Sequence, residues 1–426
     1  MVAAGKSAPH LRRGVHSARQ TWVMTNALLS AALLSASGRE LLDRLNGVDV
    51  SPKAALALSA SLRSEYPADL VAAALTQQAL RVAGQAKFSR ADQMLFTRAG
   101  LEQASSELTA RHAATRFASA GVVADLCCGI GGNLVALAAA GTDGRRVIGV
   151  DSDPVSLEFA RHNVFVYAPS ARAAFVCADV KNLRLTGVGA VFIDPARRDG
   201  QRRLPAGHYL PPLSWCLGLA EAVPRVGIKA APGLRRDLVP QGWETEFVAI
   251  GRELKEALLW SPTLAGPASR ATILPSGDTL TRAEGTSADP TPLAAPGAYL
   301  FDPNPAVTRA GLVAELASQL RAWQIDPMIA FLSSDEPTLT PFARTLRVVE
   351  SAPWHEKRFA ARLSELGIGA ADIRRRGLAG DVDLIHRRLG LKGPGAAVLV
   401  LTRVASRPWG LICTPITTDD GAFLPQ

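Results

Sequence analysis

The sequence predicts an α/β protein with a doubly wound, Rossmann-like sheet, preceded by a helical domain and followed by an α+β domain. Short β-rich runs alternate with helical runs between residues 121 and 230, which is typical of βαβ units in a parallel sheet. A stretch with helical periodicity precedes these runs. A Pro-, Gly- and Ser-rich stretch at 283–297 separates them from a last region, which completes the predicted architecture.

With 426 residues the chain is long enough for two or three domains. We expect a flexible basic tail at 1–24, a helical domain at 25–115, the sheet domain at 116–282, a linker at 283–297 and the last domain at 298–426. Strands are expected at 122–128, 147–150, 174–177, 190–193 and 226–229, with helices at 134–140, 154–166 and 213–223. Further strand-like runs are 245–250, 257–260 and 271–274. In the last domain we expect a helix at 307–323 and a strand at 397–404.

The composition indicates a folded globular protein, because 48% of the residues are hydrophobic and only 20% are charged. No run of about 20 apolar residues is present, so we expect no membrane span. The net charge of +9 is compatible with a polyanionic partner such as RNA, although an arginine-rich composition alone explains it equally simply.

The five cysteines have a spacing that predicts neither a disulfide framework nor a metal site. They are Cys127, Cys128, Cys177, Cys216 and Cys413. We therefore expect a reducing compartment and no metal. Residues 1–39 contain basic but no acidic residues and resemble a weak signal or transit peptide, but they continue into helical periodicity. A basic tail leading into a helix is the favoured interpretation, with a cytoplasmic protein as the expectation.

A glycine-rich turn follows the first predicted strand. The strand carries Asp125, and the turn contains Gly129 and Gly131, where glycine lets the backbone approach a ligand. The dinucleotide fingerprint requires a third glycine where Leu134 stands, and no Gly-Lys-Ser/Thr of a P-loop follows. A carboxylate before the turn suits a cationic ligand without phosphate, such as S-adenosylmethionine (SAM), better than a pyrophosphate.

Two further acids stand where the second and third strands end. Asp151, next to Ser152, can accept hydrogen bonds from both ribose hydroxyls, and Asp179, next to Val180, can accept one from the adenine amine. Each acid alone is equally well explained as a turn or helix cap. Three acids at the ends of three successive strands favour a SAM site.

Residues 122–195 resemble the class I SAM-dependent methyltransferases, with Asp125-Leu-Cys-Cys-Gly-Ile-Gly131 as their first motif. The resemblance implies a SAM cofactor whose methionine end lies at this motif. Cys127 stands where the family often has glycine, so its side chain narrows that end of the site. Ala160-Arg-His-Asn163 resembles a motif that follows the second strand in many nucleic-acid methyltransferases.

The fourth strand leads into Asp194-Pro-Ala-Arg197, the predicted catalytic segment. The Asp194 carboxylate and the Pro195 carbonyl can accept the hydrogens of an exocyclic base amine and stabilise its developing charge during methyl transfer. The segment resembles the Asp-Pro-Pro-aromatic motif of amino-methyltransferases, with Arg197 in place of the aromatic ring; a guanidinium can stack on a base or bind a phosphate. The alternative is an Asp-Pro turn that only leaves the sheet.

Two residues near this segment admit less specific interpretations. Lys229, in an apolar strand, either meets a substrate phosphate or pairs with a structural acid. Methylation of a ring carbon would require a cysteine nucleophile, which residues 227–234 lack, and Cys216 is expected to be a buried helix residue. Nitrogen is therefore the expected acceptor atom.

The whole layout resembles bacterial class I methyltransferases with a C-terminal THUMP-like domain. The resemblance is carried by residues 85–93, 101–106, 194–197, 308–312 and 389–393. It implies methylation of a base nitrogen of rRNA or tRNA, by domain analogy. Residues 85–109 lie where related enzymes cover SAM, and Gln103 and Ser105 are candidates there, with ordinary helix surface as the alternative.

The C-terminal region offers basic side chains that can contact phosphates or simply form a solvated surface. They are Arg374, Arg375, Arg376, His386, Arg387, Arg388, Lys392, Arg403 and Arg407. The alternatives to RNA methylation are a protein or small-molecule methyltransferase, and a nucleic-acid-binding module that retains SAM without turnover.

Overall fold

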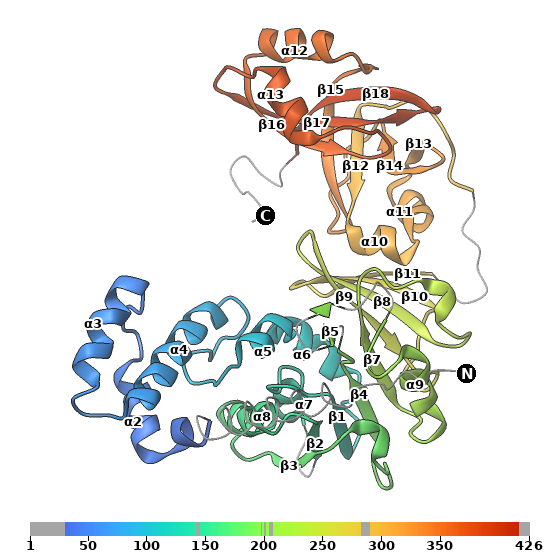
Figure 1. Ribbon diagram of the computed structural model, residues 1–426. Coiled ribbons are helices and arrows are strands. Elements are labelled where there is room, and N and C mark those ends of the chain that lie inside the picture. Colours follow the sequence, from blue (N-terminus) through green and yellow to red (C-terminus); the bar gives the residue numbers. More distant parts are fainter. Residues whose placement is uncertain are drawn as a thin grey trace, which may run out of the picture. The chain divides into compact units, whose positions relative to one another are not determined.

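The computed structural model describes residues 30–141, 145–196, 198–199, 202–203, 208–282 and 290–416 (Figure 1). The predicted tail at 1–24, Arg197 and residues 283–289 of the predicted linker lie outside these ranges. The chain divides into two compact units after Lys229. No helix among the described residues is long and apolar enough to span a membrane.

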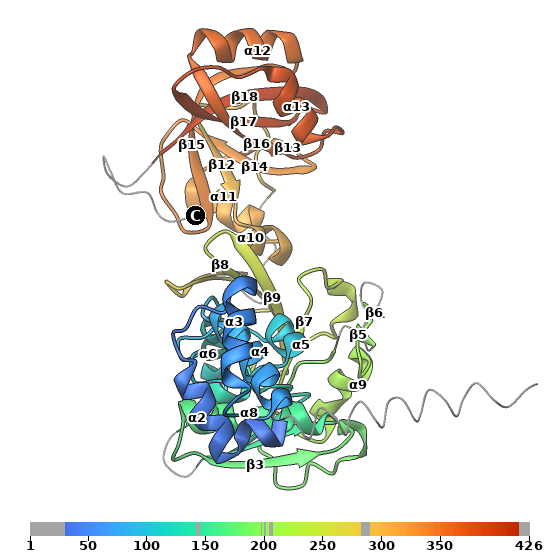
Figure 2. The same cartoon turned by 60° about the vertical axis from the view of Figure 1, so that its left-hand side comes forward.

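The first unit begins with helices, as predicted. They are α2 (Ala36–Arg44), α3 (Pro52–Leu62), α4 (Ala68–Gly84), α5 (Arg98–Gln103) and α6 (Glu107–Thr115). Capping residues explain where several begin: the Ser35 hydroxyl accepts from the Gly38 N–H, and Pro52 occupies the first turn of α3. Figures 1 and 2 both show α2 and α3 beside α4. Buried residues of these helices form one core with Ile130, Val155 and Phe159, so they are anchored to the glycine-rich turn and α8.

Five neighbouring parallel strands complete the first unit, in the order β7-β4-β1-β2-β3. The strands are β1 (Val122–Leu126), β2 (Arg146–Asp151), β3 (Arg172–Cys177), β4 (Ala190–Ile193) and β7 (Val226–Ala230). The helices that follow the first strands are α7 (Leu134–Ala139), α8 (Pro154–Tyr167) and α9 (Leu213–Gly218). Two short 3-10 turns, η1 (Val180–Asn182) and η2 (Leu219–Glu221), and the two-residue strands β5 (Arg198–Asp199) and β6 (Arg202–Arg203) lie in the connections. The predicted α/β fold class is confirmed.

The strand order reverses between β1 and β4, the point at which open parallel sheets bind ligands. From β1 the chain proceeds outward through β2 to β3 and then returns to β4 on the other side of β1. The loops after β1 and β4, which carry the predicted cofactor and catalytic residues, therefore diverge from neighbouring strand ends.

The second unit contains two groups of hydrogen-bonded strands. The first has the order β11-β10-β8-β9, formed by β8 (Glu244–Ile250), β9 (Glu253–Trp260), β10 (Ser269–Leu274) and β11 (Asp278–Arg282), preceded by η3 (Arg236–Leu238). The second has the order β13-β14-β12-β15-β18-β17-β16. Its strands are β12 (Tyr299–Pro303), β13 (Trp323–Asp326), β14 (Ile329–Ser334), β15 (Ala343–Pro353), β16 (Ile368–Arg375), β17 (Gly395–Val404) and β18 (Arg407–Pro415). The helices of the second unit are α10 (Pro305–Ala310), α11 (Val313–Leu320), α12 (Glu356–Glu365) and α13 (Val382–Leu389).

The single helix predicted at 307–323 is wrong. Gly311 adopts a left-handed conformation (φ 69°) and ends α10, and α11 then runs only to Leu320. Glycine tolerates this conformation at a helix end because it lacks a Cβ. Trp323, the expected last helical residue, instead begins β13.

Asn163 of α8 joins three parts of the first unit. Its fully buried side chain accepts from the Leu95 N–H (2.8 Å) and donates to the carbonyls of Leu95 (3.0 Å) and Ile130 (2.9 Å). The amide therefore satisfies three buried backbone groups at once and ties the segment before α5 and the glycine-rich turn to α8.

We expect Asn163→Ala to lower the free energy of unfolding by about 3 kcal/mol, because it leaves these backbone groups without partners. Urea unfolding of the full chain measures the change. Asn182→Ala, at an exposed position, is the matched control and is expected to cost under about 0.5 kcal/mol. Equal stabilities of the two variants would contradict the structural role assigned to Asn163.

Candidate active site

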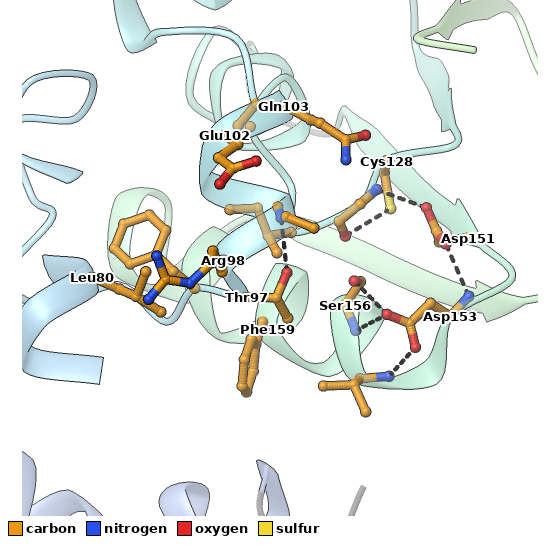
Figure 3. Close-up of a pocket in the computed structure, with 18 of the residues that line it drawn as sticks. Leu80, Thr97, Arg98, Glu102, Gln103, Cys128, Asp151, Asp153, Ser156 and Phe159 are labelled. Atoms are coloured by element: carbon orange, nitrogen blue, oxygen red, sulfur yellow. Dashed lines mark hydrogen bonds between the residues drawn. The ribbon is translucent and has the colours of Figure 1, made fainter. Parts of the chain in front are cut away.

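A cavity of about 1270 Å³ lies in the first unit, between the strand ends and the N-terminal helices. The turn after β1, Asp151 and Asp194 line one side, and residues of α4 and α5 line the other. Figure 3 shows Gln103 of α5 pointing toward the turn that carries Cys128, with Asp151 nearby. Ligand pockets usually occupy about 300–1,000 Å³, so this cavity has room for a cofactor and part of an acceptor.

The turn after β1 is held in a conformation that glycine permits. Gly129 and Gly131 have φ of 53° and 86°, and a Cβ on Gly131 would lie 3.2 Å from the Ala160 Cα. Cys127 also has a positive φ, 59°, which is uncommon for a residue with a side chain. The site therefore retains a strained backbone at the position that glycine often occupies in the family.

Asp151 closes the turn onto β2. Its carboxylate accepts from the Gly129 N–H (2.8 Å) with one oxygen and from the Asp153 N–H (2.9 Å) with the other. Burial raises the pKa of Asp151, and these backbone hydrogen bonds act in the opposite direction. Asp153 in turn caps α8, accepting from Val155, Ser156 and the Ser156 hydroxyl. Ser152 lies between these acids but does not line the cavity.

Asp125 is buried beneath the turn, only 1% exposed, and does not line the cavity. Among the described residues neither of its carboxylate oxygens accepts a hydrogen bond of ordinary geometry, although the Leu134 N–H and the Lys229 charge act to lower its pKa. Burial, followed by the charges of Asp194 and Asp151, raises its pKa well above the ordinary value. A buried carboxyl group that accepts no hydrogen bond of ordinary geometry is the kind of group that a bound cation stabilises, so the site fits the cationic end of SAM.

Asp194 lies where β4 ends, and Lys229 of β7 holds it. The Lys229 Nζ donates to the Asp194 Oδ2 at 2.7 Å, and the side chains are 13% and 27% exposed. The Asp194 N–H donates to the Leu126 carbonyl at 3.3 Å, which fixes the residue beside β1. Of the two interpretations of Lys229, pairing with an acid is therefore correct, and the acid is the predicted catalytic one.

The structure brings together some of the predicted site residues. The predicted residues that line the cavity are Cys127, Gly129, Asp151, Asp194, Pro195 and Gln103. The predicted residues that do not line it include Gly131, Val180, Asp179 and Ser105. The Asp179 carboxylate accepts from the Lys181 N–H at 3.0 Å and caps η1. The described residues contain no group of three or more His, Cys, Asp or Glu side chains that could hold a metal ion.

Lys87 is a functional candidate that the sequence reasoning missed. Its Nζ donates to the carbonyls of Leu101 (2.8 Å), Glu102 (3.1 Å) and Ala104 (2.9 Å) and so satisfies the end of α5. The helix lies close to the turn after β1, since a Cβ on Gly100 would lie 2.5 Å from the Ile130 Cγ2. Lys87 lies in segment 85–93, one of those that carry the family resemblance. Nothing in the sequence identifies the three carbonyls to which its ammonium group donates.

Family models match three parts of the chain. A methyltransferase-domain model matches residues 123–193, a THUMP domain-like model matches 343–415, and a domain of unknown function matches 30–84. Two relatives, uncharacterized S-adenosylmethionine-dependent methyltransferases from two strains of Mycobacterium tuberculosis, are 39% identical over 339 residues. These alignments cover 76% of this chain and 89% of each relative.

The fold is also similar to the crystal structure of a candidate methyltransferase from Porphyromonas gingivalis W83. The TM-score is 0.69 over 85% of this chain and 98% of that chain, at 19% sequence identity. A likeness at this identity concerns the fold alone.

The parallel sheet, the turn after β1 and the acids at the strand ends define the fold of a class I methyltransferase. The chain belongs to the S-adenosylmethionine-dependent methyltransferases and carries a C-terminal THUMP-like domain. It is thus an enzyme of the methyl-transferring class with SAM as its cofactor, and the predicted family, enzyme class and cofactor are confirmed.

We expect Lys87→Met to raise the Kd for SAM about tenfold, because a charged donor that satisfies three carbonyls contributes about 1.5 kcal/mol or more. Isothermal titration with SAM measures the effect. Lys53→Met removes an exposed lysine and serves as the control, and Lys87→Arg should restore part of the affinity. A Kd for Lys87→Met within twofold of the parent value would contradict the role of α5 in covering the cofactor.

Proposed function

We propose that the enzyme transfers the methyl group of SAM to a base nitrogen of RNA. The observation that carries the proposal is the position of Asp194 and Pro195 on the cavity, directly beyond the residues assigned to the cofactor. The match of residues 343–415 to a THUMP domain-like model supports RNA as the acceptor class. An RNA substrate and a SAM cofactor both fit a cytoplasmic enzyme.

The proposed cofactor contacts are supported by the positions of acids at the strand ends. Asp151 is assigned to the ribose hydroxyls, the turn containing Cys127 and Gly129 to the methionine end, and Asp125 to the cationic amino group, which would stabilise the charged form of its buried carboxyl group. Asp179, Val180, Ser152 and Gly131 remain proposed contacts of the adenine and of the turn. When bound, SAM would supply the methyl group of its sulfonium: the carbon–sulfur bond would break as the acceptor nitrogen bonds the methyl carbon, and that nitrogen would then lose a proton.

Asp194 and Pro195 are assigned to the acceptor amine. Lys229 donates to the Asp194 Oδ2, which holds the carboxylate in one orientation, and Oδ1 is assigned to the acceptor. Among the described residues no hydrogen bond is donated to the Pro195 carbonyl, so both oxygens can accept the amine hydrogens. Holding the amine in this way directs its lone pair toward the methyl group and stabilises the positive charge that develops on nitrogen.

The charge of the cavity limits which part of RNA can enter. Five carboxyl groups and two cations line it, namely Asp69, Glu102, Asp151, Asp153, Asp194, Arg98 and Lys229. Phosphates are disfavoured in such a cavity, whereas a neutral base is not. We infer that a single base enters, turned out of its strand, while the backbone stays outside.

The same acidic lining favours a second candidate, a cationic amine on a protein or a small molecule. Such an acceptor would be attracted by the carboxyl groups, and its methylation would need no phosphate contacts. The two candidates differ in salt dependence, because binding through phosphates weakens steeply with salt.

The test is transfer of labelled methyl groups from SAM to fractionated RNA, DNA, protein and small molecules from cells that lack the enzyme. We expect label in RNA, and at least about a 100-fold lower rate for Asp194→Ala with SAM affinity retained. Glu158→Ala is the control and should keep the parent rate, because this half-buried side chain of α8 pairs with Arg161 and does not line the cavity. Label in protein or small molecules would replace RNA by the second candidate, and an active Asp194→Ala variant would contradict the role of Asp194.

A further inference from the structure

The second unit contains four arginines that converge from three separate parts of the chain. Arg252 lies in the turn between β8 and β9, Arg344 on β15, Arg374 on β16 and Arg376 directly after it. We call these residues the arginine cluster. Arg374 and Arg376 were among the basic residues noted in the sequence, but Arg252 and Arg344 join them only in the folded chain.

Asp302 fixes two members of the arginine cluster. The Arg252 Nη2 donates to the Asp302 Oδ2 at 2.8 Å, and the Arg376 Nη2 donates to the Asp302 Oδ1 at 2.9 Å. The Asp302 side chain is 4% exposed, whereas the two arginines are 32% and 31% exposed. The Arg376 guanidinium also lies over the Phe331 ring, 5.2 Å from its centre. Both guanidiniums are therefore held in place while part of each faces solvent.

Asp372 fixes the other two members in the same way. Its Oδ2 accepts from the Arg344 Nη1 at 2.6 Å and from the Arg374 Nε at 3.2 Å. Arg344 is paired directly with Asp302 in the β12–β15 register. Asp372 and Arg374 alternate along β16, and Arg376 follows the end of this strand. The two acid-centred groups are thus neighbours and form one surface.

The arginine cluster retains uncompensated positive charge. Four guanidiniums share two carboxylates, and arginine cannot lose its proton to relieve the repulsion. Burial lowers the pKa of Arg252; Asp302 raises it, and Arg374, Arg344 and Arg376 lower it further. Each guanidinium has five N–H donors, and the bonds to the acids use one nitrogen of each. The remaining donors match the oxygens of phosphodiesters.

We propose that the arginine cluster binds the sugar-phosphate backbone of the RNA substrate. The inference rests on the proposed RNA acceptor. It assigns phosphate binding to a site outside the acidic cavity, where phosphates are disfavoured. Because such contacts fix the position of the RNA and do not read its sequence, the cluster contributes affinity to every RNA of suitable shape.

The test compares two double variants with the same change in charge. Arg344→Gln with Arg374→Gln removes half of the cluster and leaves Asp372, which is 42% exposed and can be hydrated. Arg358→Gln with Arg362→Gln removes two arginines that share Glu350 on another part of the same domain. Binding of bulk transfer RNA to the full chain is measured at several salt concentrations, and SAM affinity verifies folding.

We expect the cluster variant to lose about tenfold in RNA affinity and to lower the salt slope by about two, one for each phosphate contact. The control variant should keep the parent affinity and slope. Equal losses in both variants, or no loss in either, would overturn the proposal; the latter would leave the cluster to an acidic protein partner or to a structural role.

The same proteins distinguish this proposal from the proposed function. In one outcome, the parent enzyme methylates RNA, and the cluster variant binds RNA as tightly as the parent. That result overturns only the proposed role of the arginine cluster in binding RNA. In a second outcome, RNA binding depends on the cluster but the parent enzyme methylates only protein or small molecules. That result overturns RNA as the methyl acceptor and leaves the arginine cluster as an RNA-binding site. If the parent enzyme binds no RNA, the proposed role of the arginine cluster is overturned. The product labelled in the methyl-transfer assay then identifies the acceptor class independently.

Discussion

The hydrogen bond from the Gly129 N–H to the Asp151 carboxylate is the contact on which the geometry of the active site depends. It joins the turn after β1 to the end of β2 and brings the two segments assigned to the cofactor together. The positive φ of Gly129 and the close approach of Gly131 to Ala160 permit the same arrangement. Because the turn packs under α5, this contact also determines how the N-terminal helices can cover the cavity.

The acceptor side is organised around a different constraint, the crowding of carboxyl groups where β1 and β4 end. Among the described residues Asp125 accepts no hydrogen bond of ordinary geometry, and burial raises its pKa, whereas Asp194 is paired with Lys229. The two carboxyl groups therefore suit different ligands: a bound cation would stabilise the charged form of Asp125, and the oriented Asp194 carboxylate suits a neutral amine. In the second unit the net local charge is positive, because the four guanidiniums of the arginine cluster share two carboxylates. An acidic cavity admits a neutral base but disfavours phosphates, and a basic surface binds an anionic backbone. Both features fit the proposed RNA substrate.

The sequence predicted those parts that depend on local patterns. Alternating strands and helices located Asp125, Asp151 and Asp194 at the ends of strands, and adjacent parallel strands bring such ends together. The break at Gly311 was missed because apolar residues continue on both sides of it. The Lys87 cap and the joining of Arg252 with Arg344 were missed because they are contacts between residues far apart in the sequence. For the same reason the sequence left the partner of Lys229 open.

A crystal structure of the enzyme with S-adenosylhomocysteine, the demethylated cofactor, tests the central claim most directly. The account predicts hydrogen bonds from both ribose hydroxyls to Asp151, the amino group above Asp125, and the sulfur facing Asp194 across the cavity. A ligand bound with its ribose away from Asp151, or with Asp194 turned away from the sulfur, would contradict the assignment of these residues.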